Sequence, residues 1–112
     1  MKHLKKRFPK IKIGGYAATG LYYVTDTEEE RQSRPRDKYF YDFFHGFMEY
    51  IRVHESPIDF FSWHSYADAA SNVVFAEYAR KTLDEYGFTH TETHLNEWNP
   101  GRDVRGTTQD LA

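Results

Sequence analysis

The sequence predicts an α/β protein built from parallel β/α units. The first observation is the order of its patterned segments, which alternate strand, helix, strand, helix, strand within 112 residues. The second is that both helical segments are long enough to be the crossovers that parallel strands require. The third is the stretch IDFFSW, residues 58–63, whose apolar run is typical of a buried parallel strand.

The chain begins with a basic segment followed by a short apolar alternation. Residues 2–7 are expected to form the last turns of a helix, which ends before Pro9 because proline disfavours helical geometry in the preceding residue. Ile11 and Ile13 alternate with lysines ahead of two glycines, which predicts a strand at about 11–14. The double glycine marks a place where the backbone needs positive φ or a close approach.

A long aromatic helix is expected in the middle of the chain. Residues 16–37 carry no sustained period and are predicted to form a loop, and loops of that length are often functional. From Tyr39 onward the apolar residues recur with the spacing of one helix face, until Pro57 marks the end of the helix. The stripe consists of Phe40, Phe43, Phe44, Phe47 and Ile51.

The second half of the chain supplies another helix and another strand. The helix is expected at about 72–86, with Ser71 or Asn72 as its cap and Gly87 as its stop. The stretch HTETHLNEWNP follows and is expected to be extended, because it comes after a helix-stopping glycine and is rich in threonine.

Both ends of the chain have the patterns of incomplete elements. The chain starts in the end of a helix, and the closing stretch GRDVRGTTQDLA is expected to be a loop followed by the first turn of another helix, capped by Thr107 or Thr108. These patterns indicate a piece of a larger α/β domain.

Composition narrows the classes of protein to which the chain can belong. Apolar residues make up 39% and charged residues 29%, which is typical of a folded globular protein. The net charge of −2 gives no electrostatic reason to expect a nucleic-acid partner, and the basic start is interpreted as a solvated helix end without a function. No apolar run approaches the roughly 20 residues of a membrane span. The chain has no cysteine, so it cannot bind a metal through thiolates. We expect no cofactor. Aromatic residues, at 18%, fill cores but also line sugar-binding clefts.

A metal site is considered at the third strand, where two histidines and a glutamate occur close together. They are His90, Glu92 and His94. On an extended strand they lie on one face but spread over about 13 Å at roughly 3.3 Å per residue. Bonds from a metal to such ligands are near 2 Å, so one ion cannot reach all three. We therefore expect structural roles for these residues and no metal.

Polar and aromatic side chains gather where the predicted strands end. Glu97 comes at the end of the third strand. If side chains alternate along the strand, Glu97 lies on the same face as Leu95 and Thr93. The carboxyl ends of parallel strands are where the catalytic residues of a barrel lie, although a glutamate in a loop salt bridge is the simpler interpretation. The candidates for holding a sugar beside Glu97 are Trp63, His64 and Tyr66 from the second strand and Asn96, Trp98 and Asn99 from the third.

Three segments of the chain resemble strands five, six and seven of the clan A glycoside hydrolases. They are separated by helices and are, in order, KIGGYA, DFFSWHSY and HLNEWNP. The resemblance is to family 39, the β-xylosidase and α-L-iduronidase group, and covers residues 4–110. It implies that residues 1–112 form about three eighths of a (β/α)8 TIM barrel. It also implies a retaining mechanism in which Glu97 is the nucleophile, while His64 and Tyr66 help to hold the sugar and the nucleophile.

A retaining mechanism needs a second carboxyl group about 5 to 5.5 Å from the nucleophile. The resemblance puts that acid/base upstream of this chain, and Glu92 is expected to point away from Glu97 by strand parity. The expected function is therefore the nucleophile side of a hydrolase of β-xyloside-like bonds, with further copies or a missing barrel half as partner. The alternative is a non-catalytic α/β module that binds carbohydrate through Trp63, Trp98 and tyrosines, or that self-associates through its open sheet edges.

Overall fold

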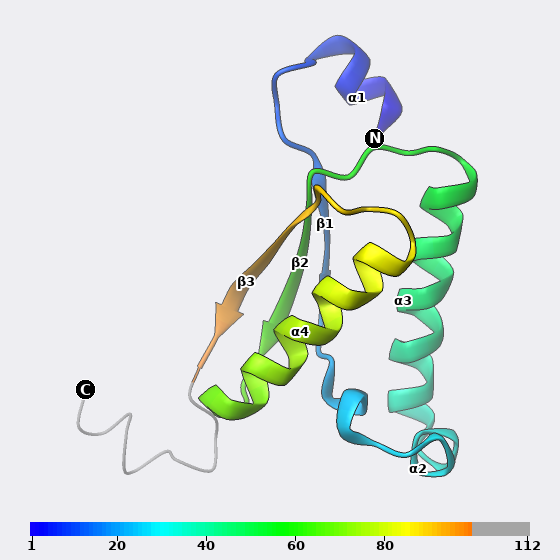
Figure 1. Ribbon diagram of the computed structural model, residues 1–112, viewed down its shortest axis with the longest axis vertical. Helices are drawn as coiled ribbons and strands as arrows, with labels where there is room; N and C mark the ends of the chain where they lie inside the picture. Colours follow the sequence, from blue (N-terminus) through cyan, green and yellow to red (C-terminus); the bar gives the residue numbers. More distant parts are fainter. Residues whose placement is uncertain (100–112) are drawn as a thin grey trace, which may run out of the picture.

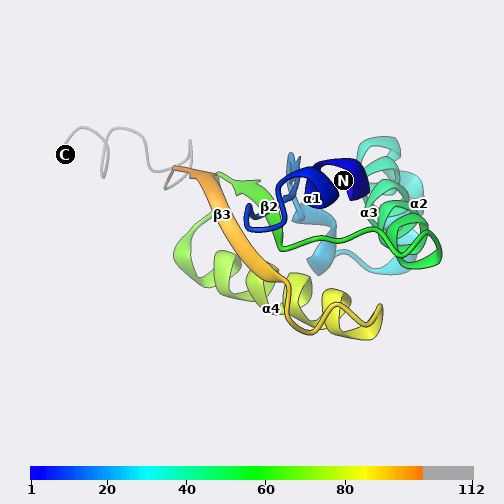
Figure 2. The same ribbon diagram turned by 90° about the horizontal axis from the view of Figure 1, so that it is seen from above.

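The computed structural model describes residues 1–99, which form a three-stranded parallel sheet with two long helices against one of its faces (Figures 1 and 2). The predicted alternation of strands and helices and the parallel sheet are both confirmed. The strands, in sheet order, are β1 (Gly14–Ala18), β2 (Phe60–Ser65) and β3 (Glu92–Trp98). The crossovers are α3 (Pro35–Val53) and α4 (Ala69–Glu85).

Aromatic side chains fill the space between the sheet and the two helices. Phe61 of β2 is fully buried and stacks on Phe44 of α3, with ring centroids 4.7 Å apart. Trp63, two residues further along β2, meets Phe75 of α4 edge-on at 6.4 Å. Since alternate residues of a strand point to the same side, the helices cover the face of Phe61 and Trp63. The opposite face of β2 presents Phe60, Ser62 and His64.

β1 begins later than the sequence predicts. The strand expected at 11–14 ends where β1 starts, so the double glycine lies inside the strand and does not end it. Gly14 is needed there because a Cβ would come within 2.0 Å of the carbonyl oxygen of Phe60. The residues before β1 are held by Asp59, which accepts a hydrogen bond from the Ile13 N–H at 2.8 Å and pairs with Lys5 at 2.7 Å. The Lys5 ammonium, followed by the Ile13 N–H, lowers the pKa of Asp59.

The loop predicted at 16–37 is mostly structured, which corrects that prediction. It contains a short 3-10 helix, η1 (Tyr22–Thr25), and the helix α2 (Glu28–Ser33). α2 starts with a capping box, in which Thr27 Oγ1 accepts a hydrogen bond from the Glu30 N–H at 3.1 Å and the Glu30 side chain accepts one from Thr27. A search for apolar periodicity misses α2 because none of its residues is buried.

α4 begins three residues before the predicted start. Asp68 is the cap, since its Oδ1 accepts a hydrogen bond from the Ser71 N–H at 2.7 Å. Ser71 and Asn72, the predicted caps, therefore lie inside the first turn of the helix. Gly87 follows the end of α4 with a φ of 92°, which confirms the prediction that this glycine ends the helix.

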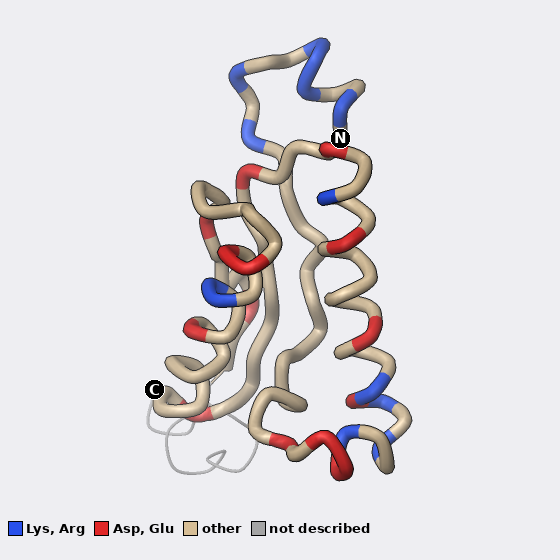
Figure 3. Tube along the Cα trace, turned by 45° about the vertical axis from the view of Figure 1, so that its right-hand side comes forward, with Lys and Arg blue, Asp and Glu red and all other residues tan. Residues whose placement is uncertain are grey.

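The amino-terminal helix α1 (Lys2–Arg7) has the predicted bounds, and none of its residues is buried. Lys and Arg concentrate in this segment, near the amino ends of the strands (Figure 3). Within residues 1–99 no helix combines the length and the apolar character needed to cross a bilayer. The helical turn predicted to be capped by Thr107 or Thr108 lies outside the described residues.

Candidate functional site

A bulge in β3 decides which way Glu97 points. Leu95 pairs with Trp63 and Glu97 pairs with His64, so Asn96 has no partner on β2. An extra residue in one strand reverses the alternation of side chains beyond it. Glu97 therefore lies on the same face as His64, not on the face of Leu95 as the sequence predicts. The prediction was wrong because it assumed an unbroken alternation along the strand.

Glu97 is in contact with two side chains from the end of β2. The Tyr66 hydroxyl donates a hydrogen bond to Glu97 Oε1, and His64 Nδ1 lies 3.7 Å from Glu97 Oε2. The Glu97 side chain is still 53% exposed, whereas that of His64 is 21% exposed. The Tyr66 hydrogen bond thus orients the carboxylate through Oε1, while the half-exposed carboxylate remains open to a ligand from solvent.

The backbone that carries Tyr66 is held by neighbouring segments. The Tyr66 N–H donates to Tyr22 Oη of η1 at 3.0 Å, and Ser65 Oγ accepts from the Ala67 N–H at 3.2 Å. The Ser65 carbonyl accepts from the Asn99 N–H, just beyond β3, at 3.3 Å. Sequence reasoning missed Tyr22, because its contribution depends on a contact across 44 positions of the chain.

The other predicted site residues are divided between the strand end and the core. Asn96 and Trp98 are exposed at the end of β3, the latter at 67%, and Asn99 is half-buried next to them. Trp63 is only 2% exposed, and its Nε1 has no hydrogen-bond partner among the described residues. Its ring lies on the face covered by α4, away from Glu97. The structure thus brings Glu97 together with His64 and Tyr66, whereas Trp98 pairs with Ser65 and points to the opposite face of the sheet from Glu97.

The end of β1 carries a second bulge, two strands away from Glu97. Tyr16 pairs with Ser62 and Ala18 pairs with Trp63, which leaves Ala17 as the extra residue, with a φ of 65°. The Ala17 N–H donates to Ser62 Oγ at 3.0 Å. A hollow of about 250 Å³ lies between this bulge and the amino-terminal half of α3. Glu97 and its two contacts do not line it.

The histidines of the HTETHLNEWNP stretch lie away from the contacts of Glu97. His94 stacks on Phe60 at 4.6 Å and its Nε2 lies 2.9 Å from Glu92. Glu92 also pairs with Lys12 at 2.7 Å, and that hydrogen bond is the main cause that lowers the pKa of Glu92. Because of the bulge, Glu92 and Glu97 face the same side of the sheet. The prediction from strand parity that Glu92 points away from Glu97 was therefore wrong. Glu97 still lies five positions beyond Glu92, or roughly 16 Å along the strand.

No protein-family model, curated protein or solved structure matches the chain. In the part of the chain that the structure describes, no three His, Asp or Glu side chains are grouped as metal ligands. A carboxylate, a phenol and an imidazole lie together at one end of the sheet.

Proposed function

We propose that the chain is part of the (β/α)8 barrel of a retaining glycoside hydrolase resembling family 39, acting on β-xyloside-like bonds with Glu97 as its nucleophile. The observation that carries the proposal is the contact of the Glu97 carboxylate with Tyr66 and His64 at the carboxyl ends of two adjacent parallel strands. Catalytic side chains of barrels lie at this end of the strands. Glu97 also lies on the sheet face opposite the helices, which becomes the inner face when such a sheet closes into a barrel.

The proposed chemistry takes place in two steps at Glu97. One carboxylate oxygen attacks the anomeric carbon while the bond from that carbon to the leaving oxygen breaks, and water then cleaves the glycosyl ester. Since Oε1 accepts the Tyr66 hydrogen bond, Oε2 is the oxygen available for attack. His64, 3.7 Å from Oε2, lies where its ring nitrogen can donate to a sugar hydroxyl.

The amides of Asn96 and Asn99, at the end of β3, offer hydrogen-bond donors for the hydroxyl groups of the sugar. Trp98 is exposed, but it pairs with Ser65, so its ring points to the opposite face of the sheet from Glu97 and does not contact the sugar in this proposal. Trp63 has no part in this proposal because it is buried in the core. Glu92 is too distant to be the acid/base, so the proposal assigns that proton transfer to a carboxyl group outside the described residues.

Release of the phenol from an aryl xyloside tests the proposal, provided that the leaving group departs without an acid catalyst. We expect Glu97→Gln to lower the rate by roughly 10³-fold, because the nucleophile is lost. Glu92→Gln, on the same strand and the same face, is the matched control and should leave the rate unchanged. An unchanged rate in Glu97→Gln would mean that Glu97 is not the nucleophile.

The exposure of Trp98 favours a second candidate, a non-catalytic carbohydrate-binding module. That function predicts binding of a xylo-oligosaccharide, measured by calorimetry, which Trp98→Ala abolishes. It also predicts that Glu97→Gln binds as well as the wild type and that no phenol is released by either protein.

A further inference from the structure

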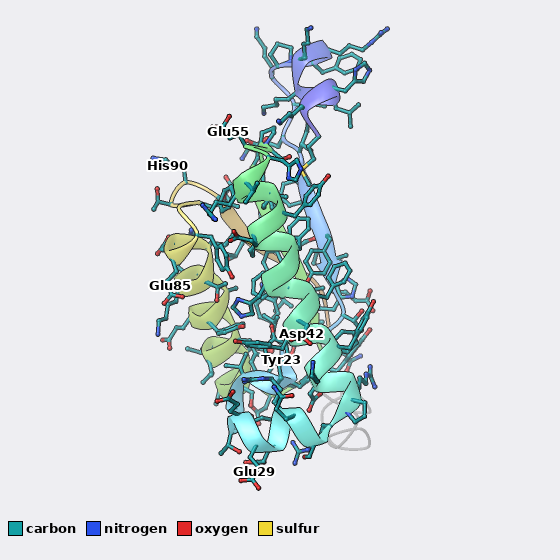
Figure 4. All side chains as sticks on the ribbon, turned by 90° about the vertical axis from the view of Figure 1, so that its right-hand side faces the viewer. Tyr23, Glu29, Asp42, Glu55, Glu85 and His90 are labelled. Carbon is teal, nitrogen blue, oxygen red and sulfur yellow. The ribbon has the colours of Figure 1, made fainter. Side chains whose placement is uncertain are left out.

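Tyr22 of η1 lies between two buried neighbours and reaches the end of β2. Leu21 and Tyr23, on either side of it, are buried, whereas Tyr22 is 36% exposed. Figure 4 shows Tyr23 between the two long helices, where its ring meets Tyr41 of α3 at 5.6 Å and Tyr78 of α4 at 5.7 Å. These contacts hold η1, and with it the backbone of Tyr22, against both helices.

The ring of Tyr22 has a defined place beside α4. It meets Phe75 edge-on, with ring centroids 5.7 Å apart. A Cβ on Gly20 would come within 2.7 Å of Tyr22 Cδ2, so a larger residue at that position would displace the ring. Both contacts involve carbon atoms of the ring and not its hydroxyl. The ring can therefore keep its place when the hydroxyl is removed.

The hydroxyl of Tyr22 binds the peptide unit that joins the end of β2 to Tyr66. In that unit the Tyr66 N–H donates to Tyr22 Oη at 3.0 Å, and the Ser65 carbonyl accepts from the Asn99 N–H at 3.3 Å. A trans peptide unit is planar and its N–H and C=O point in opposite directions, so the two hydrogen bonds hold it from both sides. The backbone that sets the direction of the Tyr66 side chain is therefore fixed.

The Tyr22 hydroxyl takes the place of a strand partner at the end of β2. The pairing of β1 with β2 ends with Ala18 opposite Trp63. β2 continues for two residues beyond Trp63, and its pairing with β3 continues to the end of the strand. The peptide before Tyr66 is thus bound by the chain that follows β3 on one side and by a tyrosine hydroxyl on the other.

We propose that Tyr22 is a positioning residue of this site: by binding the Tyr66 N–H, its hydroxyl holds the phenol of Tyr66 on Glu97 Oε1. This inference rests on the proposed function, in which the Tyr66 hydroxyl orients the attacking carboxylate. A displacement of about 1 Å in a group of this kind can lower a rate by roughly 10²-fold. Because Tyr22 acts through Tyr66, its effect falls on the attack by Glu97 and not on the binding of the sugar.

The first turnover of the aryl xyloside measures the attack by Glu97. Tyr22→Phe removes the hydroxyl and keeps the ring against Phe75, so the protein should fold as the wild type does. We expect the saturating rate of phenol release to fall about fivefold, as for the loss of one hydrogen bond between uncharged groups. The half-saturating concentration of the xyloside should stay the same, because only the attack is affected. Tyr50→Phe, which removes an exposed tyrosine hydroxyl near the end of α3, is the matched control and should change neither value.

A double variant and a spectroscopic measurement test the route through Tyr66. Tyr66→Phe removes the hydroxyl that Tyr22 holds in this proposal, so the addition of Tyr22→Phe should lower the rate no further. The NMR resonance of the Tyr66 Cζ, in protein with isotope-labelled tyrosine, reports on the same hydroxyl without turnover. We expect Tyr22→Phe to shift it in the same direction as Glu97→Gln does, because both weaken the hydrogen bond to Glu97. Tyr50→Phe should leave the resonance in place.

The possible results separate the role of Tyr22 from the proposed hydrolase. If the wild type releases phenol and Tyr22→Phe changes neither the rate nor the Tyr66 resonance, the positioning role alone is overturned. Equal losses from Tyr22→Phe in the wild type and in Tyr66→Phe would overturn the route through Tyr66. If the wild type releases no phenol, the proposed hydrolase is wrong, and the role of Tyr22 in catalysis is overturned with it.

Discussion

At the scale of single residues, His45 shows how the space between the two long helices is used. Its Nδ1 lies 3.0 Å from Tyr86 Oη and its Nε2 lies 2.9 Å from Tyr78 Oη, so α4 and the residue that follows it contact both ring nitrogens of a histidine on α3. Burial raises the pKa of Tyr78 to about 12, which keeps that hydroxyl neutral. Burial is also the main cause that lowers the pKa of His45. The charge of Arg31 lowers this pKa further, whereas the charges of Glu85 and Asp42 raise it.

The lowered pKa of His45 predicts how stability depends on pH. The fold prefers the neutral ring, so this stabilisation is present above the unfolded pKa of about 6.5 and is lost as pH falls through the lower folded value. We expect the free energy of unfolding, measured with urea, to decrease from about pH 7 to pH 5. His45→Gln should cost about 1 to 2 kcal/mol at neutral pH and should flatten this dependence. Equal slopes in both proteins would assign the pH dependence to other groups.

At the scale of elements, the sequence predicts best where burial is periodic. The stripe Phe40 to Ile51 predicted α3, and the apolar run at 58–63 predicted β2 to within two residues at each end. Elements held by polar contacts were missed or misplaced: α2 starts with the capping box of Thr27, and α4 starts with the side chain of Asp68. Such contacts are encoded by one or two residues, so they do not produce a period.

The Asp68 cap predicts a measurable loss when its side chain is removed. Asp68→Ala leaves the Ser71 N–H without its acceptor and should lower the free energy of unfolding. Asp68→Asn keeps an acceptor oxygen and should stay close to the wild type in stability. The hydrogen bond from Ser71 also lowers the pKa of Asp68. If the two variants lose the same stability, Asp68 does not act as the cap.

At the scale of the whole molecule, the two faces of the sheet have different roles. One face holds the aromatic core beneath α3 and α4, and the other presents Glu97 and His64 at the carboxyl ends of the strands. The sequence could predict that Glu97, His64 and Tyr66 meet, because parallel strands end at the same edge of a sheet. It could not separate Trp63 from them, because the continuous apolar run around Trp63 does not reveal which face each residue occupies.

We propose that Glu97 is a nucleophile that the Tyr66 hydroxyl orients and that lies beside His64. The most direct test is intact mass followed by peptide mapping, after incubation with an aryl 2-deoxy-2-fluoro-xyloside whose leaving group departs without an acid. We expect a mass increase of one fluoroxylosyl group, located on Glu97 and absent from Glu97→Gln. A folded protein that gains no label, or that carries it on another residue, would show that Glu97 is not the nucleophile.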